Sequence, residues 1–257
     1  MNFLPIFTLI VISFLTGCSF LGGEKDTKRL VSDGLTPKEL YQKAEDLLDA
    51  GSIDQAIDQY EEILASYPGS KYSIQARLDI AYNLYKRKKY TRAISELNLF
   101  IQRYPSNIHT PYAHYLRGVI AEEKSSSLLD EIITDIAQRD VEGIREAYGY
   151  YVELIEKFPE SKYSKDAFKK LNKLKNTLAK HEFYVAIYYT NKGSNIAAIN
   201  RVQFIIQNFP NSSLMPDALH LMAYSYDILN TPELASDARK ILATNYPNYT
   251  PNYSIKN

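Results

Sequence analysis

The chain has 257 residues, enough for one large domain or two ordinary ones. Hydrophobic residues make up 45% of it and charged residues 23%, a balance that indicates a folded chain and excludes a largely disordered one. Its 30 basic and 30 acidic side chains give a formal net charge of zero, so we expect no nucleic-acid partner.

The chain opens with an uncharged apolar stretch from Asn2 to Thr16, dominated by Phe, Leu, Ile and Val. A membrane-spanning helix needs about 20 apolar residues, whereas the apolar core of a secretion signal needs roughly 7–15. We therefore predict that residues 1–17 are a signal peptide, with an uncleaved anchor as the alternative. The polar stretch Gly23–Gly34 then predicts a flexible tether within residues 18–35.

Cys18 is the only cysteine, so no intrachain disulfide framework exists. A buried, inert role is excluded because nothing before Cys18 could form a core around it. The sequence Leu15-Thr16-Gly17-Cys18 resembles the lipobox of bacterial lipoprotein precursors. The resemblance implies that Cys18 carries an S-diacylglycerol, that the signal is cut before it, and that the new amino group is acylated. Ser19 at the next position implies export to the outer membrane.

An aromatic residue followed by proline recurs along the rest of the chain. The five pairs are Tyr67-Pro68, Tyr104-Pro105, Phe158-Pro159, Phe209-Pro210 and Tyr246-Pro247. The prolines are 37, 54, 51 and 37 residues apart, which indicates a 37-residue unit with insertions of 17 and 14 residues in the third and fourth units. A fixed period in this range is typical of stacked repeats such as the tetratricopeptide repeat, a pair of antiparallel helices.

Small residues recur in one register with these prolines. Twelve residues before the prolines stand Ala56, Ala93, Ala147, Ala198 and Ala235. A further twelve residues upstream stand Ala44, Ala81, Ala186 and Ala223, and Gly118 takes the equivalent place before the third-unit insertion. Such positions suit close approach of neighbouring helices. We predict an all-α solenoid of five tetratricopeptide helix pairs over residues 36–250, with the third and fourth units enlarged. N-terminal repeats span 36–125, C-terminal repeats span 126–250, and a short polar tail follows at 251–257.

Apolar spacing places the individual helices. In chain order we expect Lys38–Ala50, Ile53–Ser66, Ser73–Arg87, Thr91–Arg103, a helix from Pro111 to a break near Ser125-Ser126-Ser127, Ser164 to about Asn191, Asn195–Asn208, Pro216–Leu229 and Pro232–Asn245. No convincing alternating strand pattern appears anywhere.

The sequence offers no set of residues suited to catalysis. The histidines His109, His114, His181 and His220 do not form a metal-binding helix motif. There is no glycine-rich phosphate loop and no nucleophile elbow. The acidic pairs Glu61-Glu62 and Glu122-Glu123 are most simply solvated. We therefore expect no catalytic residue, no metal and no cofactor.

Charge is banded along the chain, with acidic bands at Lys38–Glu62 and Glu122–Glu146 and basic bands at Lys71–Arg92 and Lys162–Lys180. These bands are either solvated faces or a docking surface for another protein. Five tyrosines fall on first helices, which line the concave face of such a solenoid: Tyr72, Tyr82, Tyr85, Tyr112 and Tyr115. They are either core residues or, together, a groove with aromatic anchors for an extended peptide.

Several stretches go beyond a generic repeat. They are Tyr72–Asp79, Ala81-Tyr82, Tyr85-Lys86, Tyr115–Gly118, Arg139-Asp140, Phe158–Tyr163, Val185–Tyr189 and Ala197–Val202. Together with the lipobox they resemble the BamD (ComL) family of outer-membrane β-barrel assembly lipoproteins over essentially the whole chain. The resemblance implies a lipid-anchored protein on the periplasmic face of the outer membrane, in the assembly complex built around BamA.

In that family the C-terminal repeats dock on a periplasmic POTRA domain of BamA. The N-terminal repeats receive unfolded barrel precursors and, where present, a second assembly lipoprotein. Carried onto this chain, the resemblance makes Arg201, with Asn200, the expected docking site, since a guanidinium suits a carboxylate. The alternative is a surface arginine with only local pairing. Arg139 and Asp140 are expected to close the third-unit insertion, and the basic band after Tyr67 would be available to the C-terminal carboxylate of a precursor.

The sequence thus favours a non-catalytic lipoprotein subunit that binds barrel precursors and couples them to the barrel-forming subunit. One alternative is a tetratricopeptide lipoprotein that serves cell-division or peptidoglycan enzymes. A second alternative, an envelope enzyme, has no residue to support it.

Overall fold

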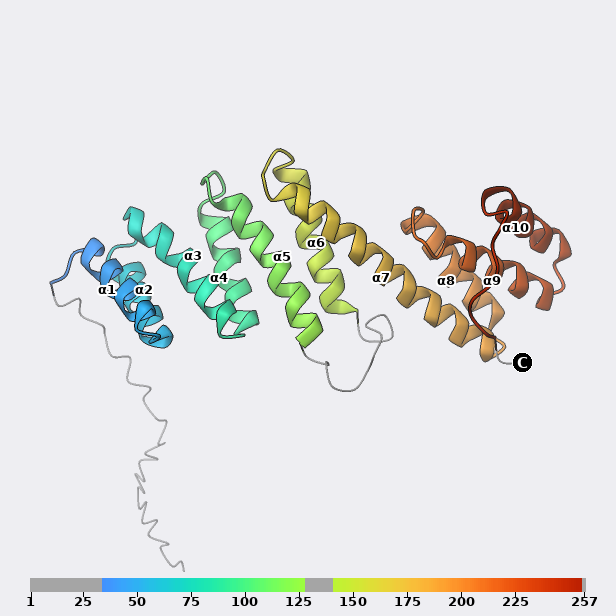
Figure 1. Ribbon diagram of the computed structural model, residues 1–257, viewed down its shortest axis with the longest axis horizontal. Coiled ribbons are helices and arrows are strands. Elements are labelled where there is room, and N and C mark those ends of the chain that lie inside the picture. The colour runs from blue at the N-terminus through green and yellow to red at the C-terminus, as the bar shows by residue number, and fades with distance from the viewer. Residues whose placement is uncertain (1–33, 128–140, 256–257) are drawn as a thin grey trace, which may run out of the picture. The chain divides into compact units, whose positions relative to one another are not determined.

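The computed structural model describes residues 34–127 and 141–255 of the chain (Figure 1). This part contains ten α-helices and no β-strand, which confirms the predicted all-α class. The helices are α1 (Pro37–Asp49), α2 (Ile53–Ser66), α3 (Lys71–Lys86), α4 (Tyr90–Arg103), α5 (Thr110–Ser127), α6 (Glu142–Lys157), α7 (Ser164–Asn191), α8 (Asn195–Asn208), α9 (Met215–Ile228) and α10 (Pro232–Asn245). They form five tetratricopeptide-type pairs, and α7 with its 28 residues accounts for most of the enlargement of the fourth.

Local capping explains two of the helix starts that differ from the predicted ones. α1 begins at Pro37 because Thr36 and Glu39 form a capping box, each side chain bonded to the backbone of the other residue. α3 begins two residues before the predicted Ser73 because the hydroxyl of Ser70 accepts from the Ser73 amide and caps the helix.

The small residues of the predicted register do lie where helices meet. All nine alanines of that register are buried, none more than 2% exposed. Gly118 in α5 lies so close to α6 that a Cβ added to it would stand 2.5 Å from Cε1 of Tyr151. Even a methyl side chain at Gly118 would therefore clash with Tyr151 unless the two helices shift.

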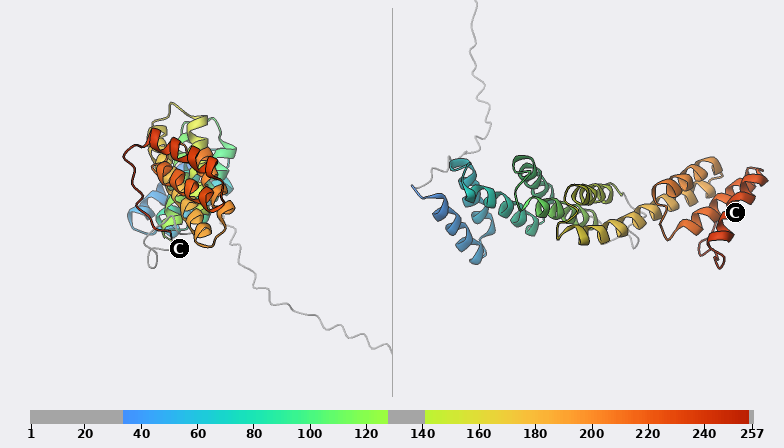
Figure 2. Two further views of the ribbon diagram at one scale, coloured as in Figure 1. Left: turned by 90° about the vertical axis from the view of Figure 1, so that its right-hand side faces the viewer. Right: turned by 90° about the horizontal axis from the view of Figure 1, so that it is seen from above.

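The helices stack in chain order, each packing against the next from α1 to α10 (Figures 1 and 2). First helices of neighbouring units also touch, α1 against α3 and α7 against α9. The first helices thereby form a common face, on which the predicted tyrosines lie.

Some charges of the first acidic and basic bands pair with one another across neighbouring units. Asp54 of α2 pairs with Arg87 over 2.9 Å and with Lys89 over 3.3 Å, and Glu61 of α2 pairs with Arg92 of α4. These pairs join the first acidic band to the first basic band, so they help to set the register between units. A docking role for these five charges is correspondingly reduced.

The prediction that the two acidic pairs are solvated is wrong for one glutamate of each pair, Glu62 and Glu122. Glu62 is buried in α2 and accepts from the Ser66 hydroxyl over 2.6 Å. Glu122 of α5 accepts from Lys170 of α7 over 3.0 Å and from the Tyr151 hydroxyl over 3.2 Å. Glu122 therefore links α5 to α6 and α7, whereas Glu62 bonds within its own helix.

Three predicted residues lie outside the described residues: Cys18, Arg139 and Asp140. Among the helices at 34–127 and 141–255, none combines the length and apolar character needed to cross a membrane.

Candidate functional site

The five predicted groove tyrosines lie on α3 and α5, but the structure brings only two of them together in a cavity. A cavity of about 320 Å³, here called the tyrosine groove, is lined by Gln75, Leu78, Asp79, Tyr82, His109, Tyr112 and Tyr163. Tyr82 is exposed, while burial raises the pKa of Tyr112 to about 12. Both rings present an aromatic surface with a polar tip.

The other three predicted tyrosines contact neighbouring helices instead of this cavity. Tyr72 packs on Tyr41 of α1 with ring centroids 5.5 Å apart. The hydroxyl of Tyr85 donates to Glu123 over 2.6 Å, and that of Tyr115 donates to Asp166 of α7 over 2.5 Å. For these three side chains the packing interpretation is therefore the better description of the contacts.

Asp79 is the one carboxylate in the lining of the tyrosine groove, and sequence analysis did not single it out. It accepts from the Tyr41 hydroxyl over 2.7 Å and from the Gln75 amide over 3.1 Å. Burial raises the pKa of Asp79 above its ordinary range, against the opposing effect of these two bonds. A carboxylate held this way favours a ligand that brings a hydrogen-bond donor.

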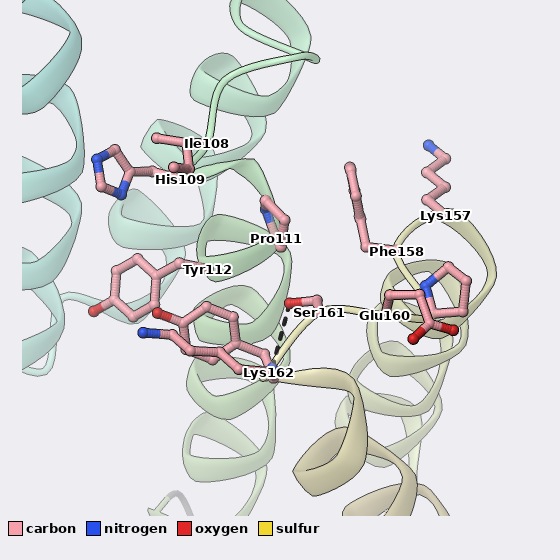
Figure 3. A pocket seen from close by; sticks show the side chains of 11 residues that line it. Ile108, His109, Pro111, Tyr112, Lys157, Phe158, Glu160, Ser161 and Lys162 are labelled. Carbon is pink, nitrogen blue, oxygen red and sulfur yellow. Dashed lines mark hydrogen bonds between the residues drawn. The ribbon is translucent and has the colours of Figure 1, made fainter.

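A second cavity, of about 640 Å³, adjoins the tyrosine groove and shares His109, Tyr112 and Tyr163 with it (Figure 3). We call it the loop cavity, because the segments before α5 and before α7 supply most of its lining. Its apolar side chains are Ile108, which is 86% exposed, Pro111, Phe158 and Pro159. Lys157, Glu160 and Lys162 add charge to the same lining. The cavity suits an apolar side chain that lies near an anionic group.

In the sequence the aromatic–proline pairs indicate only the repeat period, so the loop cavity was not predicted. Folding brings the segment Ile108–Tyr112 beside the Phe158-Pro159 stop, and together they line the cavity. A useful signal in the sequence was the isoleucine–histidine pair between Asn107 and Thr110, placed where a purely polar loop would be expected.

Arg201 of α8 lies beside a buried carboxylate. Its Nη1 donates to Oε2 of Glu182 over 3.0 Å, and Nη2 of Arg145 in α6 donates to Oε1 of the same carboxylate over 2.9 Å. Glu182 is only 2% exposed, whereas the side chains of Arg145 and Arg201 are 40% and 44% exposed. Local pairing therefore holds for Arg201, but part of its guanidinium still faces solvent.

Asn200 is exposed next to Arg201, and both belong to a shallow depression with Tyr189, Ala197 and Phe204. The depression combines an amide, a cation fixed from behind by Glu182, and two aromatic rings. Such a surface suits a protein partner that offers a carboxylate.

A buried cluster around Arg117 occupies the contact between α5 and α6. Its guanidinium lies 4.0 Å from the ring centroid of Tyr150, pairs with Glu153, and donates to Asn98 over 2.8 Å. It also lies 3.1 Å from Nδ1 of His114. The cluster joins three helices and has no opening of its own, so we assign it to stability.

His114 should make the protein less stable as the pH falls from 6.5 towards 4. Burial, assisted by the positive charge of Arg117, lowers the pKa of His114 to about 4 in the folded state. The unfolded chain takes up a proton near pH 6.5 while the folded chain does not, so stability is complete above that pH and declines below it. Urea titrations at pH 7.5 and 5 should differ by about 1–3 kcal/mol in unfolding free energy.

The matched control for this pH dependence is His114→Gln, which keeps a polar side chain of similar length and cannot titrate. Its unfolding free energy should change less between the two pH values than that of the parent chain. An equal change in both proteins would assign the dependence to other groups.

No group of three or more His, Cys, Asp or Glu side chains suited to a metal ion occurs within residues 34–127 and 141–255. The histidines are instead distributed over the loop before α5, α5, α7 and α9.

Comparison with known proteins gives the family. The family model described as "YfiO: Outer membrane lipoprotein" matches residues 33–241. The chain belongs to the YfiO family of outer membrane lipoproteins. The family assignment covers every one of the ten helices except the last residues of α10.

Several curated relatives of this chain carry the name "Outer membrane protein assembly factor BamD". One from Xylella fastidiosa (strain Temecula1) is 31% identical over 96% of this chain and 84% of its own length. One from Neisseria meningitidis serogroup A is 34% identical over 91% of this chain and 87% of its own length. One from Pasteurella multocida is 29% identical over 95% of this chain and 92% of its own length. These alignments extend over nearly the whole of both partners, and they confirm the predicted resemblance.

Proposed function

We propose that this protein is a non-catalytic, lipid-anchored subunit of the machinery that assembles β-barrel proteins in the outer membrane. The observation that carries the proposal is family membership over residues 33–241, together with relatives named as outer membrane protein assembly factors over almost their full length. A solenoid of helix pairs, which offers extended surfaces on which other proteins dock, supports the same role.

Attachment to the membrane is proposed to run through Cys18. The lipobox resemblance supports acylation there, and the polar residues that follow give a tether between lipid and solenoid. Two or more acyl chains give stable anchoring, which a single chain does not. The signal before Cys18 would direct export, and Ser19 would direct the lipidated protein on to the periplasmic face of the outer membrane.

Docking on the barrel-forming subunit, a BamA-like protein with POTRA domains, is proposed for the depression around Asn200 and Arg201. Glu182 fixes one edge of the Arg201 guanidinium and leaves the exposed edge available to a partner carboxylate. Other assembly lipoproteins remain expected partners of the N-terminal repeats.

Unfolded barrel precursors are proposed to bind the tyrosine groove and the adjoining loop cavity. Aromatic walls and the acceptor Asp79 suit an extended chain that brings apolar side chains and amide donors. Four cations of the basic band, Arg77, Arg87, Lys89 and Arg92, are paired within the fold, which reduces their part in the proposed carboxylate contact. Lys162 beside the loop cavity is the better candidate for the carboxylate of a precursor.

Crosslinking in cells tests the two surfaces. A photoreactive residue in place of Tyr82 should trap unfolded barrel precursors, and one in place of Asn200 should trap the large barrel subunit. Exposed Asp58, on second helix α2, is the control and should trap neither. Recovery of cell-division proteins or peptidoglycan hydrolases from Tyr82 and Asn200, without a barrel protein, would favour the scaffold alternative.

A further inference from the structure

The segment that follows α10 packs back onto the solenoid beside α7 and α9 (Figure 1). The ring of Tyr253 meets that of Phe183 in α7 edge to face, with centroids 5.0 Å apart. Its hydroxyl lies 2.8 Å from Nδ1 of His220 in α9. The residues after Pro251, expected from sequence to be a polar tail, thus include an aromatic anchor seated between two helices.

A second tyrosine four residues earlier holds the same segment. The Tyr249 hydroxyl donates to Oδ1 of buried Asp217 over 2.6 Å, and its ring lies 5.9 Å from that of His220. Burial lowers the pKa of His220, so the imidazole is neutral near pH 7 and its Nδ1 shares a hydrogen bond with the Tyr253 hydroxyl, which also lies 3.5 Å from the backbone oxygen of Asp217. Within residues 250–255 no backbone amide bonds to a backbone carbonyl, so side chains hold the segment in place.

The tail occupies a position that is open elsewhere on the solenoid. Phe183 and His220 stand three residues before the small-residue positions Ala186 and Ala223, and Asp217 stands six before Ala223. The corresponding positions before Ala81 are Leu78 and Gln75, and Tyr112 stands six before Gly118. These last three residues line the open tyrosine groove. The tail thus lies in the groove between the fourth and fifth units. The equivalent positions of the second and third units line the tyrosine groove, which is open.

We propose that Phe183, Asp217 and His220 form a second peptide-binding site, specific for an extended segment with two tyrosines four residues apart. The chain's own Tyr249 and Tyr253 occupy this site, and a peptide of the same chemistry replaces them when the tail is released. Exchange is feasible because the tail is held by ring contacts, the packing of Ile255 and a few side-chain hydrogen bonds, which a peptide of the same chemistry can replace. The tethered tail acts at an effective concentration on the order of millimolar, so it excludes weaker competitors.

Binding of a labelled peptide with the sequence of residues 248–257 tests the site. The chain with Tyr253→Ala should bind this peptide at least tenfold more tightly than the parent chain, because its own anchor is gone. Tyr253→Phe, which keeps the ring and loses the hydroxyl, should give a smaller gain. A peptide with alanine in place of its second tyrosine should bind neither protein.

Two further variants separate the site from nonspecific effects. Tyr188→Ala removes an exposed tyrosine on the same helix α7 and should leave peptide binding at the parent level. His220→Ala combined with Tyr253→Ala should abolish the gain. The proposal is overturned if neither Tyr253 variant gains affinity, or if the gain survives the loss of His220. The assay contains no barrel subunit or precursor, so its failure leaves the proposed function untouched.

Discussion

Gly118→Ala should lower the free energy of unfolding by about 1–2 kcal/mol, although alanine is the better helix former. The added Cβ would lie 2.5 Å from Cε1 and 2.8 Å from Cδ1 of Tyr151. That ring has little room to move, since it is fully buried and its hydroxyl donates to Glu122. The clash between the added Cβ and the Tyr151 ring can therefore be relieved only if α5 and α6 move apart. Urea denaturation followed by circular dichroism measures the loss.

Gly149 in α6 provides the matched control, because it is exposed and an added Cβ would meet nothing within 4 Å. Gly149→Ala should raise the free energy of unfolding by about 0.5–1 kcal/mol, through helix propensity alone. The two glycines thus predict shifts of opposite sign for one chemical change. A stabilising effect at Gly118 as large as that at Gly149 would contradict the close helix contact.

The fold could be predicted from the sequence because its determinants are local and repeated. The buried alanines and the aromatic–proline stops recur at fixed spacing, so each unit supports the assignment of the others. The predicted bounds of α8 and α10 agree with the structure to the residue. α6 had no predicted bounds, because the third-unit insertion interrupts the register before it.

The candidate site was less predictable because it depends on contacts between units. A tyrosine on a first helix has the same local pattern whether its hydroxyl faces solvent, as at Tyr82, or donates to the next unit, as at Tyr115. The carboxylate Asp79 stands in a basic band, and nothing around it in the sequence indicates its burial. Only the stacking of α1 on α3 brings Tyr41 to it.

The docking surface likewise depends on a residue, Glu182, that could not be recognised from the sequence. The sequence pointed to Arg201 through a family resemblance, yet the residue that holds Arg201 in place lies 19 positions earlier, inside the long helix α7. A lone glutamate there has no distinguishing pattern. Its role emerges from three helices, since α6 and α8 each supply one arginine to it.

Glu182→Gln should lower the free energy of unfolding by about 1–3 kcal/mol. The substitution keeps the shape of the side chain and removes the charge that both arginines share. Breaking a fully buried ion pair costs about 3–5 kcal/mol, but here both guanidiniums are partly exposed and regain water. The same variant should also reduce recovery of the barrel subunit, because Arg201 loses the contact that orients it.

Arg145→Gln separates these two effects of Glu182. It leaves the bond between Arg201 and Glu182 in place, so it should cost less stability than Glu182→Gln and leave recovery of the barrel subunit unchanged. Arg145 and Arg201 share one carboxylate, so the costs of removing each should not add in the double variant. If Glu182→Gln and Arg145→Gln impair recovery equally, the loss follows from weakened packing between α6 and α7. If only Glu182→Gln impairs it, the carboxylate acts by holding Arg201 towards its partner.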